Sequence, residues 1–378
     1  MQFKRLLTIM SLTVAVCCYE QQVMAQGVTL PQSSGSAEVS QTIGITTVSV
    51  RYSRPSVISP QGQDRTGQIW GSLVPYGYNN LGFGTATEAP WRAGANENTV
   101  IEFSDDVKIE GKDLPAGTYG LHYAVFEDGK ATVIFSKSHS AWGSYFYDKA
   151  DDALRVDVQT VEIPATNVLT YHFPTASTGS AILALDWEKK RIPFNIEVNT
   201  PELVYQNLKR ELQSSPGFQL NSWTSAANYL VQNQIHLDDA LAWADAAIEG
   251  QFFSQKNFQT LSTKSAVLTA MGKTEEAAAV MDEAIKVPGA TINNYYNYGR
   301  QLIAANKDEK ALEVFKEANK KWPDHWLAPH GLARGYSALG EYNKALKYEK
   351  TAYGKAPDGS KQFLEGYLKT LEEGKDFN

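Results

Sequence analysis

The C-terminal half of the chain repeats itself with a period of 34 residues, and no other feature limits its possible folds as strongly. Small residues and a proline recur at this offset: Ala311 with Ala345, Ala318 with Ala352, and Pro323 with Pro357. Small side chains allow the backbones of two crossing helices to come close, and a proline ends a helix because it lacks the N–H donor. A unit of this length buries its apolar face only by stacking on its neighbours. The spacing therefore predicts a stack of antiparallel helix pairs.

Weaker copies of the repeat lie upstream. Alanines recur one period earlier and, in a degenerate copy, at an offset of 37 residues: Ala277 and Ala284, then Ala240 and Ala247. We therefore expect one degenerate and three good repeats, with an unrelated helical bundle as the alternative. The expected segments are a linker helix at residues 201–221, the repeats at residues 222–357 and a capping helix at residues 360–374.

The apolar residues of the N-terminal half follow a period of two, which is typical of strands with one buried face. In "TTVSVRY", for example, Val48, Val50 and Tyr52 share a face. Runs such as "TVIEF", "ATVIFS", "SAILALDW" and "IPFNIEV" are rich in β-branched and aromatic residues, and turn signals separate them. About nine short strands at this spacing predict an antiparallel β-sandwich or barrel. We therefore expect an antiparallel β-sandwich at residues 30–200, followed by an all-α solenoid.

The clearest turn signal among these strands is "EDGK" at residues 127–130. Asp-Gly tolerates positive φ at both central positions, so we expect a two-residue hairpin turn here. The stretch at residues 145–153 interrupts the alternation, and we expect it to form a loop or a single helical turn.

The first 25 residues have the organisation of a secretory signal peptide. Lys4 and Arg5 precede an apolar core at residues 6–18, and "VMA" at residues 23–25 offers small residues for cleavage. This order predicts an exported protein that resides in the periplasm or outside the cell. A membrane anchor is the alternative, although the core is too short to span a bilayer with its flanks.

Both cysteines of the chain, Cys17 and Cys18, lie in this segment. They raise a lipoprotein signal as a further alternative, but Val16 is a poor fit to the small residue expected before a lipidated cysteine. After cleavage no disulfide is possible, so we expect stability to come from burial in the core. No other segment has the apolar length of a membrane span, and a net charge of −7 without a basic cluster argues against nucleic acid as a partner.

Several segments of the N-terminal half occur in an order that resembles a known family. They include "VSVRYSRPSV", "WRAGANENTVIEFSDDVKIEGKDLPAGTYGLH", "TVIFSKSHSAWGSYFYD" and "LALDWEKKRIPFNIEV". Over residues 30–200 the chain is similar to the domain of unknown function (DUF) 2911 family, found mainly in exported bacterial proteins. The resemblance implies a fold and an exported address, and it implies no chemistry. One departure is "YNNLGFGTATEAP" at residues 78–90, which lengthens a loop where family members run almost directly into the tryptophan-arginine pair.

The stretch "PWRAGANENT" concentrates polar side chains between expected strands. Arg92 offers a planar set of donors that suits a carboxylate or a phosphate. Nearby polar and aromatic residues could complete a site for a glycan or another small ligand. The candidate ligand-binding residues are Arg92, Asn96, Glu97, His122, Trp142 and Tyr145. If they form a site, we expect Arg92, Glu97, His122 and Trp142 to converge around one open cleft.

A purely structural role is the alternative for the same stretch. Arg92 would then pair with Glu97 or Asp186, and Asn96 would bond backbone groups of the loop. A hydrolase that uses Glu97 and Glu102 as its two carboxylates is a further alternative, although acidic pairs are common by chance. The six histidines lack paired ligand spacing, and no phosphate-loop, dinucleotide or "GxSxG" motif occurs, so we expect no metal and no cofactor.

The helical half resembles the tetratricopeptide repeat (TPR), and the resemblance implies a binding groove. In such solenoids the first helix of each pair lines the concave side, with fixed positions pointing inward. The residues at these positions include Asn293, Tyr296, Asn297 and Arg300 in one repeat, and His330 and Arg334 in the next. This use of the repeat implies a protein or peptide partner. Leu327 and Gly331 stand where a carboxylate clamp would have basic residues, and a merely solvated face is the alternative.

These features favour a non-enzymatic binding or assembly module of the bacterial envelope, whose solenoid holds a protein partner. The alternative is a carbohydrate- or small-ligand-binding protein, or a hydrolase, that acts at the loop of residues 92–97. The signal peptide and the repeat support the first hypothesis, whereas the polar stretch supports the second.

Overall fold

A computed structural model of the chain describes residues 31–378. The predicted signal peptide at residues 1–25, with both cysteines, lies outside the described residues. The chain divides into two compact units, one ending at Val198 and the other running from Asn199 to Asn378, which we call the β half and the helical half. No helix of residues 31–378 is long and apolar enough to span a bilayer.

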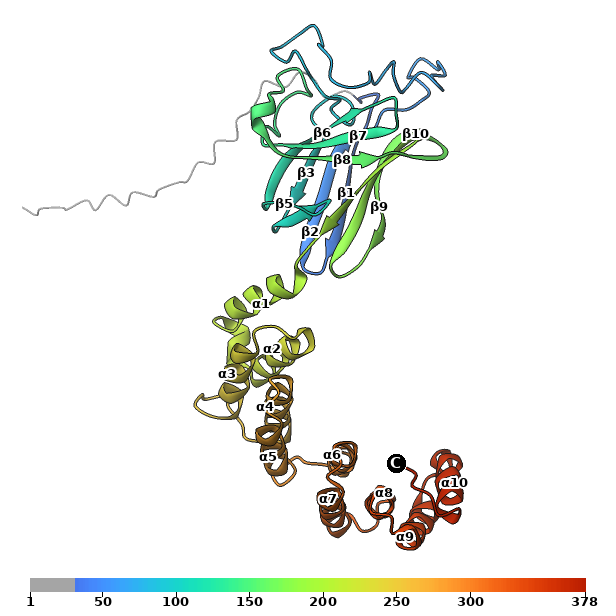
Figure 1. The fold of residues 1–378 in the computed structure, drawn as a ribbon. Coiled ribbons are helices and arrows are strands. Elements are labelled where there is room, and N and C mark those ends of the chain that lie inside the picture. Colours follow the sequence, from blue (N-terminus) through green and yellow to red (C-terminus); the bar gives the residue numbers. More distant parts are fainter. Residues whose placement is uncertain (1–30) are drawn as a thin grey trace, which may run out of the picture. The chain divides into compact units, whose positions relative to one another are not determined.

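The β half consists of two antiparallel sheets (Figure 1). The first has the strand order β1-β2-β3-β6-β7-β8: Ser36–Ile43, Thr46–Ser53, Val100–Phe103, Gly117–Val125, Lys130–Ser136 and Asp152–Gln159. The second has the order β5-β4-β10-β9: Lys112–Leu114, Val107–Ile109, Ser180–Glu197 and Val161–Ala176. The alternation predicted for β2 is confirmed, because Val48, Val50 and Tyr52 are all buried.

Aromatic side chains join the two sheets into a sandwich. Tyr52 of β2 packs edge-to-face on Tyr171 of β9, with ring centroids 4.7 Å apart. Phe135 of β7 meets Phe194 of β10 at 5.6 Å. Rings of this size bury a large apolar area and favour edge-to-face contact. The predicted antiparallel β-sandwich is confirmed.

Two of the strands are longer than the sequence predicts. β9 has 16 residues and β10 has 18, so "SAILALDW" and "IPFNIEV" belong to one strand. The charged run between them stays in the sheet because β10 is bulged on both sides of Glu188, which has a φ of 53°. A bulge takes up an extra residue without ending the pairing. Pro164 is tolerated in β9 because that strand forms an edge of its sheet.

The hairpin predicted at residues 127–130 forms between β6 and β7, but its turn type differs from the prediction. The N–H of Phe126 donates to the carbonyl O of Lys130, which encloses a three-residue loop. Only Gly129 has positive φ, at 85°. Three-residue loops of this kind place a glycine in the left-handed region after a type I turn. The expectation of two residues with positive φ is therefore wrong.

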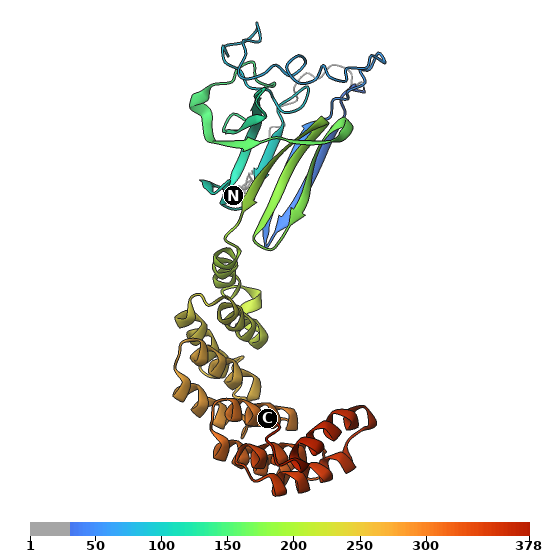
Figure 2. The ribbon, with the colours of Figure 1, turned by 45° about the vertical axis from the view of Figure 1, so that its right-hand side comes forward.

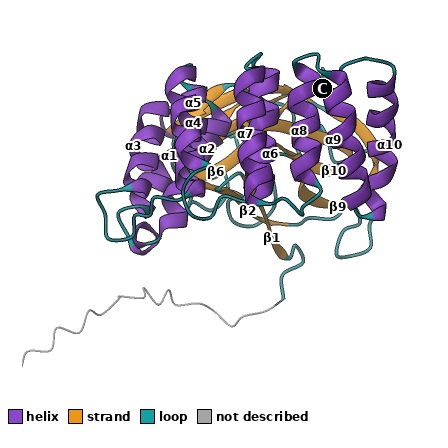
Figure 3. Ribbon diagram, turned by 90° about the horizontal axis from the view of Figure 1, so that it is seen from below, coloured by secondary structure: helices purple, strands orange, loops and turns teal. Residues whose placement is uncertain are grey.

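The helical half contains ten α-helices within the described residues (Figure 2). α1 (Thr200–Glu211) precedes four helix pairs, and α10 (Asp358–Glu372) follows them. The pairs are α2–α3 (Leu220–Asn233, Leu237–Ile248), α4–α5 (Phe258–Ala270, Thr274–Ala284), α6–α7 (Ile292–Ala304, Asp308–Lys321) and α8–α9 (Leu327–Ala338, Tyr342–Lys355). Figure 3 shows the helices of this half standing side by side.

The spacing of the helices reproduces the period of the sequence. The second helices of three successive pairs begin at Thr274, Asp308 and Tyr342, each 34 residues after the one before. The repeated alanines are buried, with at most 4% of their surface exposed: Ala240, Ala247, Ala277, Ala284, Ala311, Ala318, Ala345 and Ala352. Small residues at helix crossings are what close approach requires. The predicted TPR-like repeat region is confirmed.

Glycines let two first helices approach the ring of Phe315 in α7. An added Cβ at Gly299 of α6 would lie 2.3 Å from this ring, and one at Gly331 of α8 would lie 2.5 Å from it. These distances are far inside van der Waals contact, so a side chain at either position would displace the ring. The same packing explains why Gly331 stands where a carboxylate clamp would have a basic residue.

Candidate functional site

Arg92 is held inside its own loop. Its Nη1 donates to the carbonyl O of Asn96, and its guanidinium carbon lies 5.0 Å from the centre of the Tyr145 ring. Ala93 and Asn96 have φ of 56° and 59°, and this left-handed backbone turns the loop back on itself. The loop thus orients the guanidinium through a backbone carbonyl and an aromatic face.

The ion pair that the structural alternative expected, between Arg92 and either Glu97 or Asp186, is absent from the described contacts, so that expectation is wrong. Asp186 of β10 accepts instead from Nη2 of Arg191 at 2.7 Å. Nε2 of His172 lies 3.0 Å from the same carboxylate. The direct pairing of β9 with β10 brings His172, Asp186 and Arg191 together. Asp186 is therefore already paired and does not bond Arg92.

Asn96 braces the loop against the chain just before β1. Its Nδ2 donates to the carbonyl O of Ser34 at 3.1 Å and to Oε1 of Gln32 at 2.6 Å. Oγ1 of Thr99 donates to the carbonyl O of Ala93 at 3.1 Å. Arg92 and Thr99 therefore satisfy carbonyl groups of the loop, whereas the Asn96 side chain bonds residues outside the loop, which differs from the loop-backbone role that the structural alternative gives to it.

His122 lies under the loop that follows β7 and is only 2% exposed. Its Nδ1 is 3.0 Å from Oγ of Ser144, and its ring packs on that of Tyr147 at 5.5 Å. Burial, followed by the nearby positive charge of Arg92, lowers the pKa of His122 to about 4. The imidazole is therefore neutral at pH 7. Residues 31–378 contain no group of three or more His, Cys, Asp or Glu side chains placed to hold a metal ion.

The candidate ligand-binding residues do not meet in one open cleft. Arg92 lines a cavity of about 480 Å³, whereas Glu97 and Trp142 line a separate hollow of about 730 Å³. His122, in β6, is buried and lines neither of these two hollows. Tyr145 packs on Arg92 and on Phe83, whose ring centroid is 5.5 Å away. The structure thus separates Glu97 and Trp142 from Arg92.

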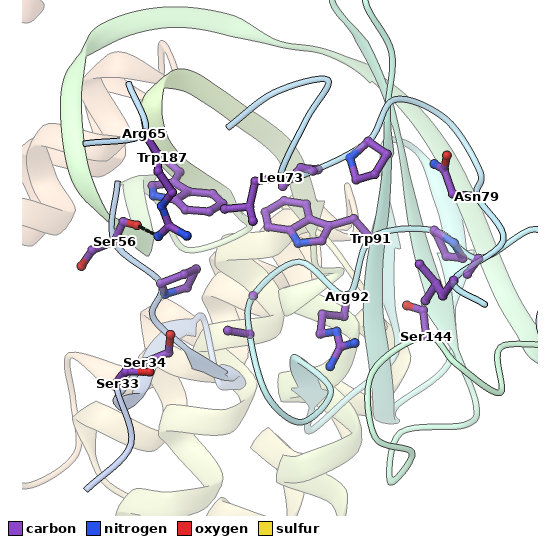
Figure 4. Close-up of a pocket in the computed structure, with 18 of the residues that line it drawn as sticks. Ser33, Ser34, Ser56, Arg65, Leu73, Asn79, Trp91, Arg92, Ser144 and Trp187 are labelled. Atoms are coloured by element: carbon purple, nitrogen blue, oxygen red, sulfur yellow. Dashed lines mark hydrogen bonds between the residues drawn. The ribbon is translucent and has the colours of Figure 1, made fainter. Parts of the chain in front are cut away.

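The cavity beside Arg92 combines aromatic rings with guanidinium groups (Figure 4). Trp91 and Trp187 stack in its wall, with ring centroids 6.0 Å apart and an interplanar angle of 18°. Arg65 and Leu73 also line the cavity. An apolar cavity with a few placed polar groups is the usual form of a small-molecule site.

Sequence reasoning missed three of these wall residues, namely Arg65, Trp91 and Trp187. Trp91 is adjacent to Arg92 in "PWR", and this adjacency is the one local signal that could have included it. Arg65 lies in a turn-rich stretch and Trp187 in β10, so no periodicity connects them with the loop. Only the folded sandwich brings these segments to one cavity.

In the helical half, four of the predicted groove residues come together. Nε of Arg334 in α8 donates to the hydroxyl of Tyr296 in α6 at 2.7 Å. The ring of His330 stacks on that of Tyr296 at 5.5 Å, and the guanidinium of Arg300 lies 5.9 Å from its centre. First helices of neighbouring repeats thus present one mixed aromatic and basic surface, which we call the α6–α8 surface.

The other two predicted residues, Asn293 and Asn297, are exposed on α6. Asn297 lines a hollow of about 670 Å³ between α4, α5 and α6, together with Ser262 and Ala266 of α4. This hollow borders α6 on the side of the preceding repeat.

His330 is not an open groove residue, because only 1% of it is exposed. Its Nδ1 lies 2.8 Å from Oε2 of Glu349 in α9, which is itself fully buried. The pair lies beneath the α6–α8 surface and fixes the orientation of the imidazole ring. A buried polar group with its partner in place specifies geometry, which is a positioning role.

A segment of the chain itself, residues 376–378, rests on the α6–α8 surface (Figure 1). Asn378 accepts from Nη1 of Arg334 and donates to its carbonyl O, both at 3.1 Å. Oδ1 of Asp376 accepts from Oγ of Ser337 at 2.6 Å. The Phe377 ring lies 5.1 Å from the Arg334 guanidinium and 4.8 Å from the Tyr367 ring of α10. Sequence reasoning did not anticipate this occupant.

Comparison with known proteins finds one family match, in the β half. Residues 34–196 match the family described as a protein of unknown function (DUF2911). A comparison with curated proteins finds no match. Solved structures similar to part of the chain include MamA, at 15% identity and a TM-score of 0.32, covering 41% of this chain and 88% of that one.

Two further solved structures are described as TPR proteins. YrrB has 17% identity and a TM-score of 0.33, covering 46% of this chain and 84% of its own. TTC0263 of Thermus thermophilus has 16% identity and a TM-score of 0.31, covering 46% of this chain and 91% of its own. At such low scores the assignment of the helical half rests on the 34-residue spacing and the buried alanines. The chain therefore contains a DUF2911 domain at residues 34–196, followed by a TPR-like helical repeat region.

Proposed function

We propose that this chain is an exported, non-enzymatic binding protein of the bacterial envelope, whose helical repeats hold a segment of a protein partner. The observation that carries the proposal is the contact between residues 376–378 and the α6–α8 surface. Export rests on the N-terminal sequence alone, with its basic start, apolar core and small residues at 23–25.

The chemistry of the occupied surface suits a short peptide. Arg334 bonds a side-chain amide and also offers its carbonyl O, while Ser337 donates to a carboxylate. Hydrogen bonds that involve a charged partner are each worth about 1.5–3 kcal/mol. Tyr367 and the guanidinium of Arg334 together enclose an aromatic side chain. The surface therefore favours a segment with an acidic residue, an aromatic residue and an amide in succession.

The hollow between α4, α5 and α6 can extend this contact. Its wall contains amide and hydroxyl side chains with apolar ones between them: Asn294, Asn297, Gln301, Ser262, Thr269 and Met281. Amide and hydroxyl groups bond both the N–H and the C=O groups of a peptide backbone. A partner longer than three residues would therefore find polar contacts on the neighbouring repeat.

A labelled peptide tests this function directly. The probe is a fluorescent peptide with the sequence "LEEGKDFN" of residues 371–378, titrated against the full chain and followed by anisotropy. We expect weak binding to the wild type, because the attached segment competes at an effective concentration of about 1 mM. Phe377→Ala should loosen that segment, and the probe should then bind at least about tenfold more tightly.

Charge variants supply the controls for this experiment. In the Phe377→Ala background, Arg334→Ala should weaken probe binding by about tenfold or more. It removes the hydrogen bond to the terminal amide, the guanidinium face against the aromatic residue, and the bond that orients Tyr296. Lys347→Ala removes the same charge from the exposed face of α9 and should leave affinity unchanged. Equal binding to the two variants, or no binding to the Phe377→Ala chain, would contradict the proposed function.

A further inference from the structure

The cavity beside Arg92 has a composition that the peptide surface does not explain. It lies within the β half, encloses about 480 Å³ and is lined by residues from several separate loops and from β10. We propose that this cavity is a binding site for a small organic anion, in which a flat apolar body carries one negatively charged group. The inference goes beyond the proposed peptide binding and does not depend on it.

The charge of the wall is the first argument. Arg65 and Arg92 both line the cavity, and no aspartate or glutamate does. Neither guanidinium forms a salt bridge with a carboxylate in the described residues. Two fixed positive charges without a counter-charge in one cavity attract an anion.

The free donors of these arginines are the second argument. Arg65 uses Nε and Nη2 to donate to the carbonyl O atoms of Val57 and Ser56. Arg92 uses Nη1 on the carbonyl O of Asn96. A guanidinium has five N–H donors in a planar arrangement, so both side chains retain donors after these bonds. The loop carbonyls hold each guanidinium in place, and the remaining N–H groups suit a carboxylate or phosphate.

The aromatic wall is the third argument. Trp91 and Trp187 stack on each other, and Trp70 packs edge-on against both at 5.7 and 6.0 Å. Trp187 is 1% exposed, yet its Nε1 has no hydrogen-bond partner in the described residues. Leaving a buried donor unpaired costs about 1–3 kcal/mol, which is unusual in a purely structural core. Rigid indole rings suit a planar apolar ligand.

The segment at residues 78–90 closes one side of the cavity. Asn79, Leu81, Ala89 and Pro90 belong to its wall. The segment is seated firmly, because a Cβ at Gly84 would lie 2.1 Å from the carbonyl O of Tyr145. Gly84 also has a φ of 79°, which disfavours any other residue. This lengthened loop therefore shapes the space available to the ligand.

Two dyes that share one aromatic body allow the contribution of the ligand's charge to binding to be measured separately from that of its apolar surface. The probes are 8-anilinonaphthalene-1-sulfonate and its neutral analogue N-phenyl-1-naphthylamine, titrated by fluorescence against the full chain. We expect saturable binding of the sulfonate, at least about tenfold tighter than the neutral analogue. Displacement by benzoate or by phenyl phosphate then tells a carboxylate site from a phosphate site.

Variants assign the binding to this cavity. Arg65→Gln/Arg92→Gln should weaken binding of the sulfonate by about tenfold or more and leave the neutral analogue within about twofold. Unchanged affinity for the neutral analogue also shows that the variant remains folded. Arg51→Gln removes an exposed charge of β2 that borders the other hollow and should change neither affinity. Equal affinities for the two dyes, an unchanged ratio in the double variant, or no saturable sulfonate binding below millimolar concentration would overturn the proposal.

Discussion

Replacing Phe315 with alanine should lower the free energy of unfolding of the helical half by about 3–5 kcal/mol. The ring is 1% exposed and fills the space between Gly299 of α6 and Gly331 of α8. Because Gly299 and Gly331 have no side chains, neither of them can move in to fill the cavity. The Tyr296 ring lies 6.2 Å from Phe315, so the same change should weaken peptide binding to the α6–α8 surface.

Amide hydrogen exchange of the α6 to α8 peptides, measured in increasing urea, reports this loss within one half of a two-part chain. One unfolding transition followed by a single spectroscopic probe would combine the unfolding of the β half with that of the helical half. Phe252→Ala is the matched control, since that ring is 79% exposed and its loss should change stability by less than about 0.5 kcal/mol. A loss below about 1 kcal/mol for Phe315→Ala would show that the glycine-lined space collapses.

Acidification from pH 7 to pH 4 should destabilise the β half by about 3 kcal/mol through His122 alone. An unfolded histidine takes up a proton below about pH 6.5, whereas burial and then Arg92 hold the folded pKa of His122 at about 4. The stability that depends on neutral His122 is therefore complete above pH 6.5. It is lost progressively as the pH falls to 4, and the loss levels off below that value.

Hydrogen exchange of the β6 peptides at pH-corrected rates measures this dependence. His122→Gln keeps a polar group near Ser144 and should reduce the acid-induced loss by about 3 kcal/mol relative to the wild type. His139→Gln changes an exposed histidine of the following loop and should leave the wild-type profile unaltered. Parallel profiles for the wild type and His122→Gln would contradict this, because they would show that the pKa of His122 is the same in the folded and unfolded states.

The helical half was predictable because its signal is local and repeated. Alanines such as Ala311 and Ala345 mark the same crossing in successive copies, so one spacing gives the number of pairs and their order. The strands were harder to delimit. The bulge at Glu188 keeps β10 continuous, and it depends on pairing with a distant strand that the alternation of one segment cannot reveal.

The candidate sites were predictable only in part. Repeat register placed Tyr296 and Arg334 on one surface, because equivalent positions of neighbouring helices face the same way. It gave no sign that residues 376–378 would cover that surface. The sequence identified the polar loop, but it did not identify the partner of Arg92. The guanidinium donates to the carbonyl O of Asn96 and not to a carboxylate, because the tight turn at Asn96 brings that carbonyl close to it.

If the α6–α8 surface binds a peptide partner as we propose, its attached occupant has a consequence for partner choice. Because residues 376–378 belong to the same chain, their local concentration does not fall when the protein is dilute. Every incoming partner must outcompete them, so the observed affinity is the intrinsic affinity reduced by the fraction of molecules whose surface is open. The apparent affinity of every peptide falls by this same factor at any protein concentration, so weakly binding peptides need correspondingly higher concentrations to occupy the surface. Residues 376–378 thus act as an intramolecular competitor that sets how tightly a partner must bind.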